Sequence, residues 1–236
     1  MAALTGILLP SLVPLPGGTF LMGDDRGRPD ERPAHRVTIG PFQAARTPVS
    51  NQEYAAFLRA TGRQPPRFWA DPRFNAPADP VVGVTWFDAA AYCAWLAAET
   101  GLRFRLPTEA EREFACRGGI ERADWPWGSE PPERRSGLAE VAVLERTHVP
   151  SEACANAYGL LCMADNVHEW CSDWYDASYY ERSPPESPMG PPAGRRRASR
   201  GGAWRHQVKF NRCSARSSLD PSFEYNDYGF RVYADA

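Results

Sequence analysis

The sequence predicts an α+β fold with long loops, and three observations lead to this prediction. Three segments carry the apolar spacing and the end signals of helices, and the N-terminal part carries the signals of strands. Residues 119–165 carry few periodic signals; a stretch of that length inside a compact domain is usually functional or held by a ligand. The chain has 236 residues, of which 43% are hydrophobic, so we expect one domain over residues 1–236.

Each of the three predicted helices begins at a capping signal and ends at a glycine. The capping-box spacing occurs at Ser50 and Glu53, at Thr85 and Asp88, and at Thr108 and Glu111. Apolar residues follow each cap at helical spacing, and the three segments close at Gly62, Gly101 and Gly118.

Strand signals lie at both ends of the chain. Gly17-Gly18 separates Leu12–Leu15 from Thr19–Met22, which predicts a hairpin or a bulge. Arg36–Ile39 alternates and predicts another strand, and Gly229–Tyr233 predicts a closing strand.

Composition argues against two classes of function. Charged residues make up 24% and the net charge is −2, so nucleic-acid binding through bulk positive charge is not expected. The basic cluster of Arg195–Arg197 and Arg200 lies in a Pro/Gly-rich stretch, which predicts a solvated loop. No apolar run reaches the roughly eighteen residues of a membrane span, and the apolar start lacks the basic region of a secretory signal. We therefore expect a cytoplasmic protein without a membrane partner.

The cysteines predict free thiols. The chain contains Cys93, Cys116, Cys154, Cys162, Cys171 and Cys213, with no CxxC spacing. A chain of this size builds a core without disulfides. Cys93 and Cys116 fall in the helical patterns and are expected to be buried.

A series of short motifs runs along about the whole chain. They are Gly17–Gly23, Pro48–Tyr54, Val82–Trp86, Arg105–Glu111, Trp125–Gly128, Tyr158–Leu160, Asp165–Trp170, Ser172–Trp174, Arg200–Trp204 and Gly229–Arg231. In this order they resemble the formylglycine-generating-enzyme, or sulfatase-modifying factor, family. The resemblance implies an elaborated C-type-lectin-like fold with little regular secondary structure and long loops.

The resemblance also implies a copper site, and this chain departs from it. Oxidases of the family hold copper with two thiolates, the first four residues after the Gly-Gly pair and the second five residues further on. His206 and Asn211 occupy these positions, and Ala203 replaces the family serine. Soft thiolates favour Cu(I), so we expect no formylglycine-generating activity. His206 and the nearby Cys213 are the candidate catalytic residues, with a redox metal of unknown identity.

A Ca²⁺ site is implied by the resemblance at Asn166, Val167 and Glu169. Side-chain and backbone oxygens are the ligands that a hard cation prefers, and a bound ion would hold an irregular segment. The alternative is that Asn166 and Glu169 only cap turns.

A candidate binding surface follows the Gly-Gly pair. Its members combine aromatic and cationic side chains, which are common in interfaces: Trp204, Lys209, Phe210, Arg212 and Tyr225. Two further arginines, Arg216 and Arg231, are expected to pair with buried acids.

Two classes of function stay open. The missing thiolate pair favours a module that binds a peptide, a protein or a small molecule. The family resemblance favours a metal-dependent oxidoreductase, non-haem or copper, that acts on a cysteine, a peptide or a small molecule. Fold alone does not choose between them.

Overall fold

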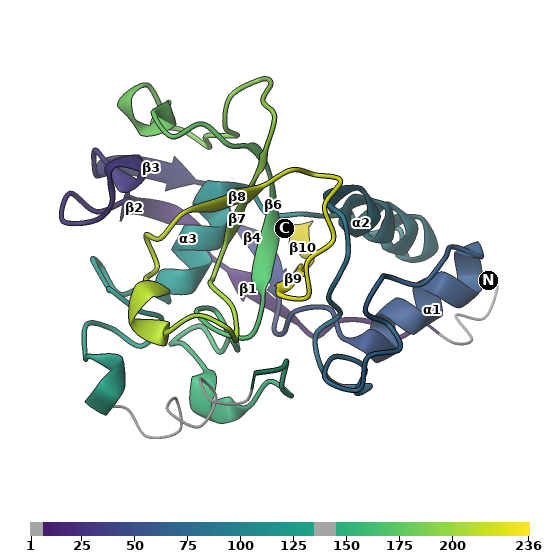
Figure 1. The fold of residues 1–236 in the computed structure, drawn as a ribbon. Coiled ribbons are helices and arrows are strands. Elements are labelled where there is room, and N and C mark those ends of the chain that lie inside the picture. The colour runs from purple at the N-terminus through teal and green to yellow at the C-terminus, as the bar shows by residue number, and fades with distance from the viewer. Residues whose placement is uncertain (1–6, 135–144) are drawn as a thin grey trace.

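The computed structural model describes residues 7–134 and 145–236 (Figure 1). Its three α-helices are α1 (Asn51–Thr61), α2 (Trp86–Thr100) and α3 (Glu109–Arg117). All three begin with a complete capping box and end at a left-handed glycine, as the sequence predicts. Helices are few and connections are long, which confirms the predicted mixed fold.

Three sheets form the rest of the regular structure. The first has the order β1 (Leu12–Leu15), β4 (Phe42–Ala45), β10 (Tyr233–Asp235), β5 (Phe104–Arg105), with antiparallel pairing throughout. The second pairs β2 (Gly18–Met22) with β3 (His35–Ile39). The third has the order β8 (Ser217–Leu219), β7 (Arg197–Arg200), β6 (His168–Trp174), β9 (Tyr228–Gly229). Short 3₁₀ helices cover Pro29–Glu31, Pro132–Arg134, Glu152–Cys154, Tyr179–Glu181 and Val208–Phe210.

Three local predictions are wrong. The strands on either side of Gly17 form no hairpin, because β1 pairs with β4 and β2 pairs with β3. Gly17 instead brings its backbone against Gly40, whose carbonyl carbon lies 2.4 Å from the position of an added Cβ. The closing strand is split into β9 and β10. Arg200 is buried on β7 and not in a solvated loop, since two glutamates neutralise it.

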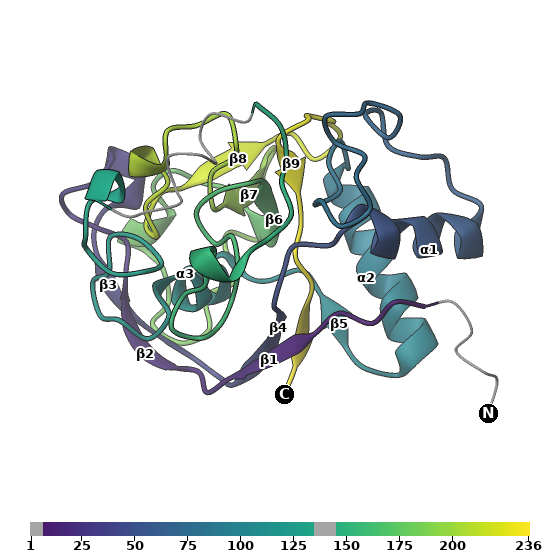
Figure 2. The ribbon, with the colours of Figure 1, turned by 90° about the horizontal axis from the view of Figure 1, so that it is seen from below.

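The hydrophobic core has two main parts, on either side of the first sheet. Figures 1 and 2 place α1 and α2 on one side of this sheet and α3 on the other, near β2 and β3. Stacked and edge-on rings of Tyr54, Phe57, Tyr92 and Phe230 fill the first part. Phe114 of α3 packs on Phe20 and Phe42 in the second part.

The third sheet positions the candidate site. Its central strand β6 begins with four consecutive buried residues, so it lacks the alternation that marks a half-exposed strand. The loops after β7 and before β9 meet at the start of β6, because β6 pairs with both strands. None of the helices in the described ranges has the length and apolar character that a membrane span requires.

Candidate functional site

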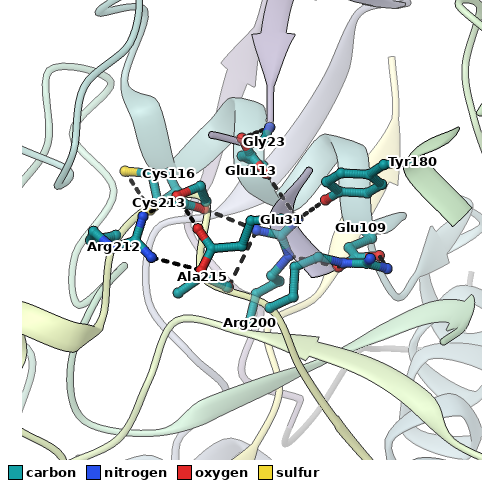
Figure 3. Close-up of polar contacts among 12 residues, drawn as sticks. Gly23, Glu31, Glu109, Glu113, Cys116, Tyr180, Arg200, Arg212, Cys213 and Ala215 are labelled. Carbon is teal, nitrogen blue, oxygen red and sulfur yellow. Dashed lines mark hydrogen bonds and ion pairs between the residues drawn. The ribbon is translucent and has the colours of Figure 1, made fainter. Parts of the chain in front are cut away.

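A buried ion-pair network joins α3 to β7 and to the segment after it (Figure 3). The guanidinium of Arg200 contacts Glu109 at 2.9 Å, Glu113 at 2.9 Å and the Tyr180 hydroxyl at 2.5 Å. Arg216 donates to both carboxylate oxygens of Glu109, at 2.8 and 2.9 Å. Opposite charges therefore compensate one another in this part of the core.

Three arginines that the sequence singled out belong to such pairs. Arg212, expected on a binding surface, donates to Glu31 at 2.6 Å beside the Ser214 hydroxyl. Arg231 contacts Glu169, and both side chains are fully buried, so the predicted pairing of Arg231 and Arg216 with buried acids is confirmed.

The predicted Ca²⁺ ligand Glu169 already has two cationic partners. Arg112 donates to its Oε2 at 2.7 Å, and Arg231 donates to its Oε1 at 2.9 Å. Burial alone opposes ionisation, but these two guanidiniums lower the pKa of Glu169. A Ca²⁺ ion bound through this carboxylate would lie beside Arg112 and Arg231, which argues against Glu169 as a ligand; Ca²⁺ binding stays a prediction. The Val167 side chain is buried.

The candidate catalytic residues His206 and Cys213 are not brought together. The sulfur of Cys213 lies 3.2 Å from that of Cys116, and both side chains are buried beside the network (Figure 3). Burial and the Cys116 contact raise the pKa of the Cys213 thiol well above its ordinary value. All six cysteines are free thiols, as predicted.

His206 instead lines an open cavity of about 560 Å³. Its wall consists of Arg28, His168, Arg200–Gly202, Arg205–Gln207, Phe210, Asn211 and Ala215–Ser217. Gly202 permits the close approach of Asn211, whose side-chain carbon Cγ lies only 2.0 Å from where a Cβ on Gly202 would be.

Three side chains at this cavity form a cluster of metal-binding type. Donor atoms of His168, His206 and Asp227 all lie within 4.8 Å of one another. The two imidazole rings have centroids 5.1 Å apart. Among the described residues, three of the eight buried polar atoms without a hydrogen-bond partner lie here: His168 Nδ1, Asp227 Oδ1 and Asn211 Nδ2. Buried polar groups are rarely left unpaired, so this concentration indicates a site for a ligand or an ion.

Electrostatics keep the two histidines neutral. Burial lowers the pKa of His168 to about 3, with further contributions from His206 and Arg205. Burial also lowers the pKa of His206, although Asp227 opposes this shift. A neutral imidazole has the lone pair that a metal ligand needs. Arg28 and Arg205, both about half exposed, add positive charge at the cavity wall.

The other predicted binding residues are dispersed. Phe210 lines the cavity and is 64% exposed. Trp204 packs on Phe74 and donates its indole N–H to the Asn226 carbonyl. Tyr225 is exposed, and its ring packs on Tyr228, which in turn contacts His168. Lys209 lies in the 3₁₀ turn with Phe210, and its side chain is outside the described part.

A second cavity, of about 540 Å³, opens beside α2 and β5. Its wall is mostly apolar, with Trp86, Cys93 and Met189 among its residues. Its one acid, Glu111, is held by Arg105 and by the cap of α3. Because its only charged groups already neutralise each other, we place the candidate active site at the His206 cavity.

Comparisons with known proteins assign the family. Residues 5–236 match the family model of the sulfatase-modifying factor enzyme 1-like domain, so the chain belongs to this family. The formylglycine-generating enzyme of Streptomyces coelicolor is 34% identical over 95% of this chain and 89% of that protein. PvdO of Pseudomonas aeruginosa has the same fold, with a TM-score of 0.84 and 30% identity over 96% of this chain and 95% of the other.

Some relatives carry a different name. Serine/threonine-protein kinase pkn1 of Chlamydia pneumoniae is 35% identical over 95% of this chain, which spans only 38% of the length of that protein. The relatives therefore differ in named activity, and membership in the family does not assign one to this chain.

Sequence reasoning missed His168 and Asp227 as site residues. The histidines of this chain have no HxH or HxxxH spacing. The three members of the cluster come from the start of β6, from the loop after Gly201-Gly202 and from the residue before β9. The available signal was that His168 lies inside the motif Asp165–Trp170.

Proposed function

We propose that this chain is a metal-dependent oxidoreductase that holds a non-haem metal ion with His168, His206 and Asp227. The observation that carries the proposal is the convergence of two imidazoles and one carboxylate at the wall of an open cavity. Two histidines and one carboxylate are the ligand set of non-haem Fe(II) oxygenases. This chain thus has a different donor set in place of the thiolate pair of the copper oxidases.

The residues present fit an Fe(II) ion in three respects. Burial lowers the pKa of both imidazoles, and among the described residues neither Asp227 Oδ1 nor His168 Nδ1 has a hydrogen-bond partner. When bound, such an ion activates O₂ at its open positions. The protein would fix the position of the ion, because the buried strand β6 holds His168 in place.

The wall of the cavity favours a substrate with an anionic group. Arg200 and Arg216 are buried in their pairs with Glu109, whereas Arg28 and Arg205, which contact Glu31 and Asp227, are about half exposed. A carboxylate-bearing peptide or small molecule would be attracted to these two guanidiniums.

Anaerobic addition of Fe(II) to metal-stripped protein tests the proposal. We expect one tightly bound Fe(II) per chain, with affinity reduced about a hundredfold or more in His206→Ala and in Asp227→Asn. Gln207→Ala, a neighbouring wall residue outside the cluster, is the matched control and should bind as the wild type does. Nitric oxide should give an EPR-active adduct with the bound Fe(II) if open positions exist. Full iron binding by His206→Ala would refute the proposal.

Formylglycine formation is expected to be absent. Cys213 is buried against Cys116, so no thiolate pair faces His206 in the described part of the chain. Incubation with Cu(I), air and a sulfatase-type cysteine peptide should leave the peptide mass unchanged. Conversion of the cysteine to the aldehyde would contradict this expectation.

A peptide- or protein-binding module is the second candidate. It is favoured by exposed aromatic side chains near the cavity region: Phe210, Phe223 and Tyr225 are 64%, 48% and 42% exposed. Such rings are typical anchors of interfaces. Replacement of both Phe223 and Tyr225 by alanine would abolish partner binding and leave Fe(II) binding unchanged if this candidate is correct.

A further inference from the structure

A second cluster of metal-binding side chains lies in the irregular segment before β6. Donor atoms of His148, Cys162 and Asp165 lie within 4.8 Å of one another. A fourth donor, the sulfur of Cys154, lies 3.8 Å from the Asp165 carboxylate. Interaction with Cys162 contributes to lowering the pKa of the Cys154 thiol. We propose that these four residues bind a structural Zn²⁺ ion, independently of the function proposed for the cavity.

The spacing of the donor atoms fits one tetrahedral ion. Zn–S bonds of about 2.3 Å and Zn–N or Zn–O bonds of about 2.0–2.1 Å place ligand atoms roughly 3.3–3.8 Å apart. The observed separations are 3.4 Å from His148 Nε2 to Asp165 Oδ2 and 3.8 Å from Cys154 Sγ to the same oxygen. Within the group of His148, Cys162 and Asp165, whose donor atoms lie within 4.8 Å of one another, the most distant pair needs to contract by less than about 1.5 Å.

The hydrogen bonds of His148 leave one ring nitrogen for an ion. Its Nδ1 lies 3.3 Å from the Val149 carbonyl, which can only accept, so the Nδ1 atom carries the proton. The other nitrogen, Nε2, is buried, faces the Asp165 carboxylate and has no hydrogen-bond partner in the described part of the chain. Two acceptors that face each other require a cation between them.

That cation is either a proton or a metal ion. A proton would make His148 and Asp165 an ordinary ion pair, and Asp165 does raise the pKa of His148 although burial opposes it. A proton shared by His148 and Asp165 does not explain why the sulfurs of Cys154 and Cys162 lie in the same cluster. Two thiols, one imidazole and one carboxylate match the ligands of Zn²⁺ and are too soft for Ca²⁺.

Asn166 holds the cluster in place. Its amide donates to the His148 carbonyl at 2.7 Å, and its oxygen accepts from the His148 N–H at 3.3 Å. The same amide nitrogen lies 3.8 Å from the Cys162 sulfur. The structure thus assigns Asn166, which the sequence indicated as a Ca²⁺ ligand, to the positioning of neighbouring donors.

A closed four-ligand site suits a structural ion. From residue 145 to residue 165 the only helix is the 3₁₀ turn Glu152–Cys154, so hydrogen-bonded regular structure contributes little. Zn²⁺ would tie the start of this segment to its end, directly before β6.

Metal analysis of the purified chain tests the proposal. Protein expressed with Zn²⁺ and purified without chelator should contain one Zn²⁺ per chain. Cys162→Ser and His148→Gln should each lower the Zn²⁺ affinity about a hundredfold or more. Cys213→Ala, which removes a buried thiol from the Cys116 contact, is the matched control and should retain the ion.

Two further arms separate the outcomes. His206→Ala should lose Fe(II) and retain Zn²⁺, whereas Cys162→Ser should do the opposite, so either proposal can fail alone. Co²⁺ titration of metal-stripped wild-type protein should give the near-ultraviolet charge-transfer band of a thiolate ligand. Because this measurement uses the wild-type protein, it does not depend on whether a variant folds. Wild-type protein without bound Zn²⁺ and without that band, or a Cys162→Ser variant that keeps its Zn²⁺, would overturn the proposal in favour of the ion pair.

Discussion

Buried acids occur in two settings in this molecule, and their partners differ. Glu109 and Glu169 each contact two guanidiniums in the network around α3 and β6. Asp165 and Asp227 are nearly as buried, but each lies against histidine, and a polar atom close by has no hydrogen-bond partner within residues 7–134 and 145–236. The first setting is electrostatically complete without a ligand, and the second is not. Burial is similar in the two settings, so the difference between them lies in the partners of the carboxylates.

The largest expected effect on stability comes from removing the charge of Glu169, which has two guanidinium partners. Glu169→Gln leaves Arg112 and Arg231 with uncompensated buried charge, which should lower the free energy of unfolding by about 3–5 kcal/mol. Urea denaturation measures this change. Glu181→Gln, on the exposed surface, is the control and should stay within about 0.5 kcal/mol of the wild type.

A comparison of the wild type with Glu169→Gln also tests the Ca²⁺ prediction. If Ca²⁺ binds through Glu169, a Ca²⁺-selective chelator lowers the melting temperature of the wild type and leaves that of Glu169→Gln unchanged. Equal melting with and without chelator would leave the two guanidiniums as the sole counter-charges of Glu169.

Asp173 is a buried acid for which no guanidinium partner is found among the described residues. It accepts from the Glu109 N–H at 2.9 Å and from the Ser172 hydroxyl at 3.1 Å, and burial together with the Glu109 charge raises its pKa to about 7. The folded state thus holds a proton that the unfolded state releases near pH 4. The stability contributed by protonated Asp173 is complete below pH 4 and is lost as the pH rises through about 7.

Asp173→Asn should remove this pH dependence. Relative to the variant, the wild type should lose about 2–3 kcal/mol of unfolding free energy between pH 5 and pH 8. Parallel denaturation curves at the two pH values measure the difference. If the difference in unfolding free energy between the two proteins were the same at both pH values, the pKa of Asp173 would not be raised by folding.

The wall of the His206 cavity is sensitive to a single methyl group. A Cβ on Gly202 would meet the Asn211 side chain at 2.0 Å, at a backbone angle φ of +67°. Gly202→Ala should therefore cost about 2–3 kcal/mol and displace Asn211. Gly62→Ala is the matched control, because Gly62 has φ of +68° but nothing within 4 Å of an added Cβ. Equal losses in urea unfolding would mean that only the backbone angle matters.

The sequence predicted the helices and the family but only part of the site. Capping boxes and C-terminal glycines are local signals, so α1, α2 and α3 could be placed without tertiary information. Strand β6 has buried residues on both faces, so period-two alternation could not mark it. The clusters around Asp165 and Asp227 depend on which loops meet in space, and the assignment of Glu169 failed to anticipate its two arginines.

Replacement of Arg205 is expected to have the smallest effect on stability. Its Nη1 lies 3.3 Å from Asp227 Oδ2, but its side chain is 46% exposed, whereas that of Arg231 beside Glu169 is fully buried. If Asp227 belongs to an incomplete site, Arg205 is only a solvent-screened neighbour, and Arg205→Gln should change the free energy of unfolding by less than about 1 kcal/mol. Removing its positive charge should also strengthen Fe(II) binding at low salt, by an amount that shrinks as salt is added. Urea unfolding together with Fe(II) titrations at two salt concentrations tests both parts. A stability loss as large as that of Glu169→Gln would place Asp227 among the structural ion pairs, and a weaker Fe(II) affinity would show that Arg205 helps to build the site.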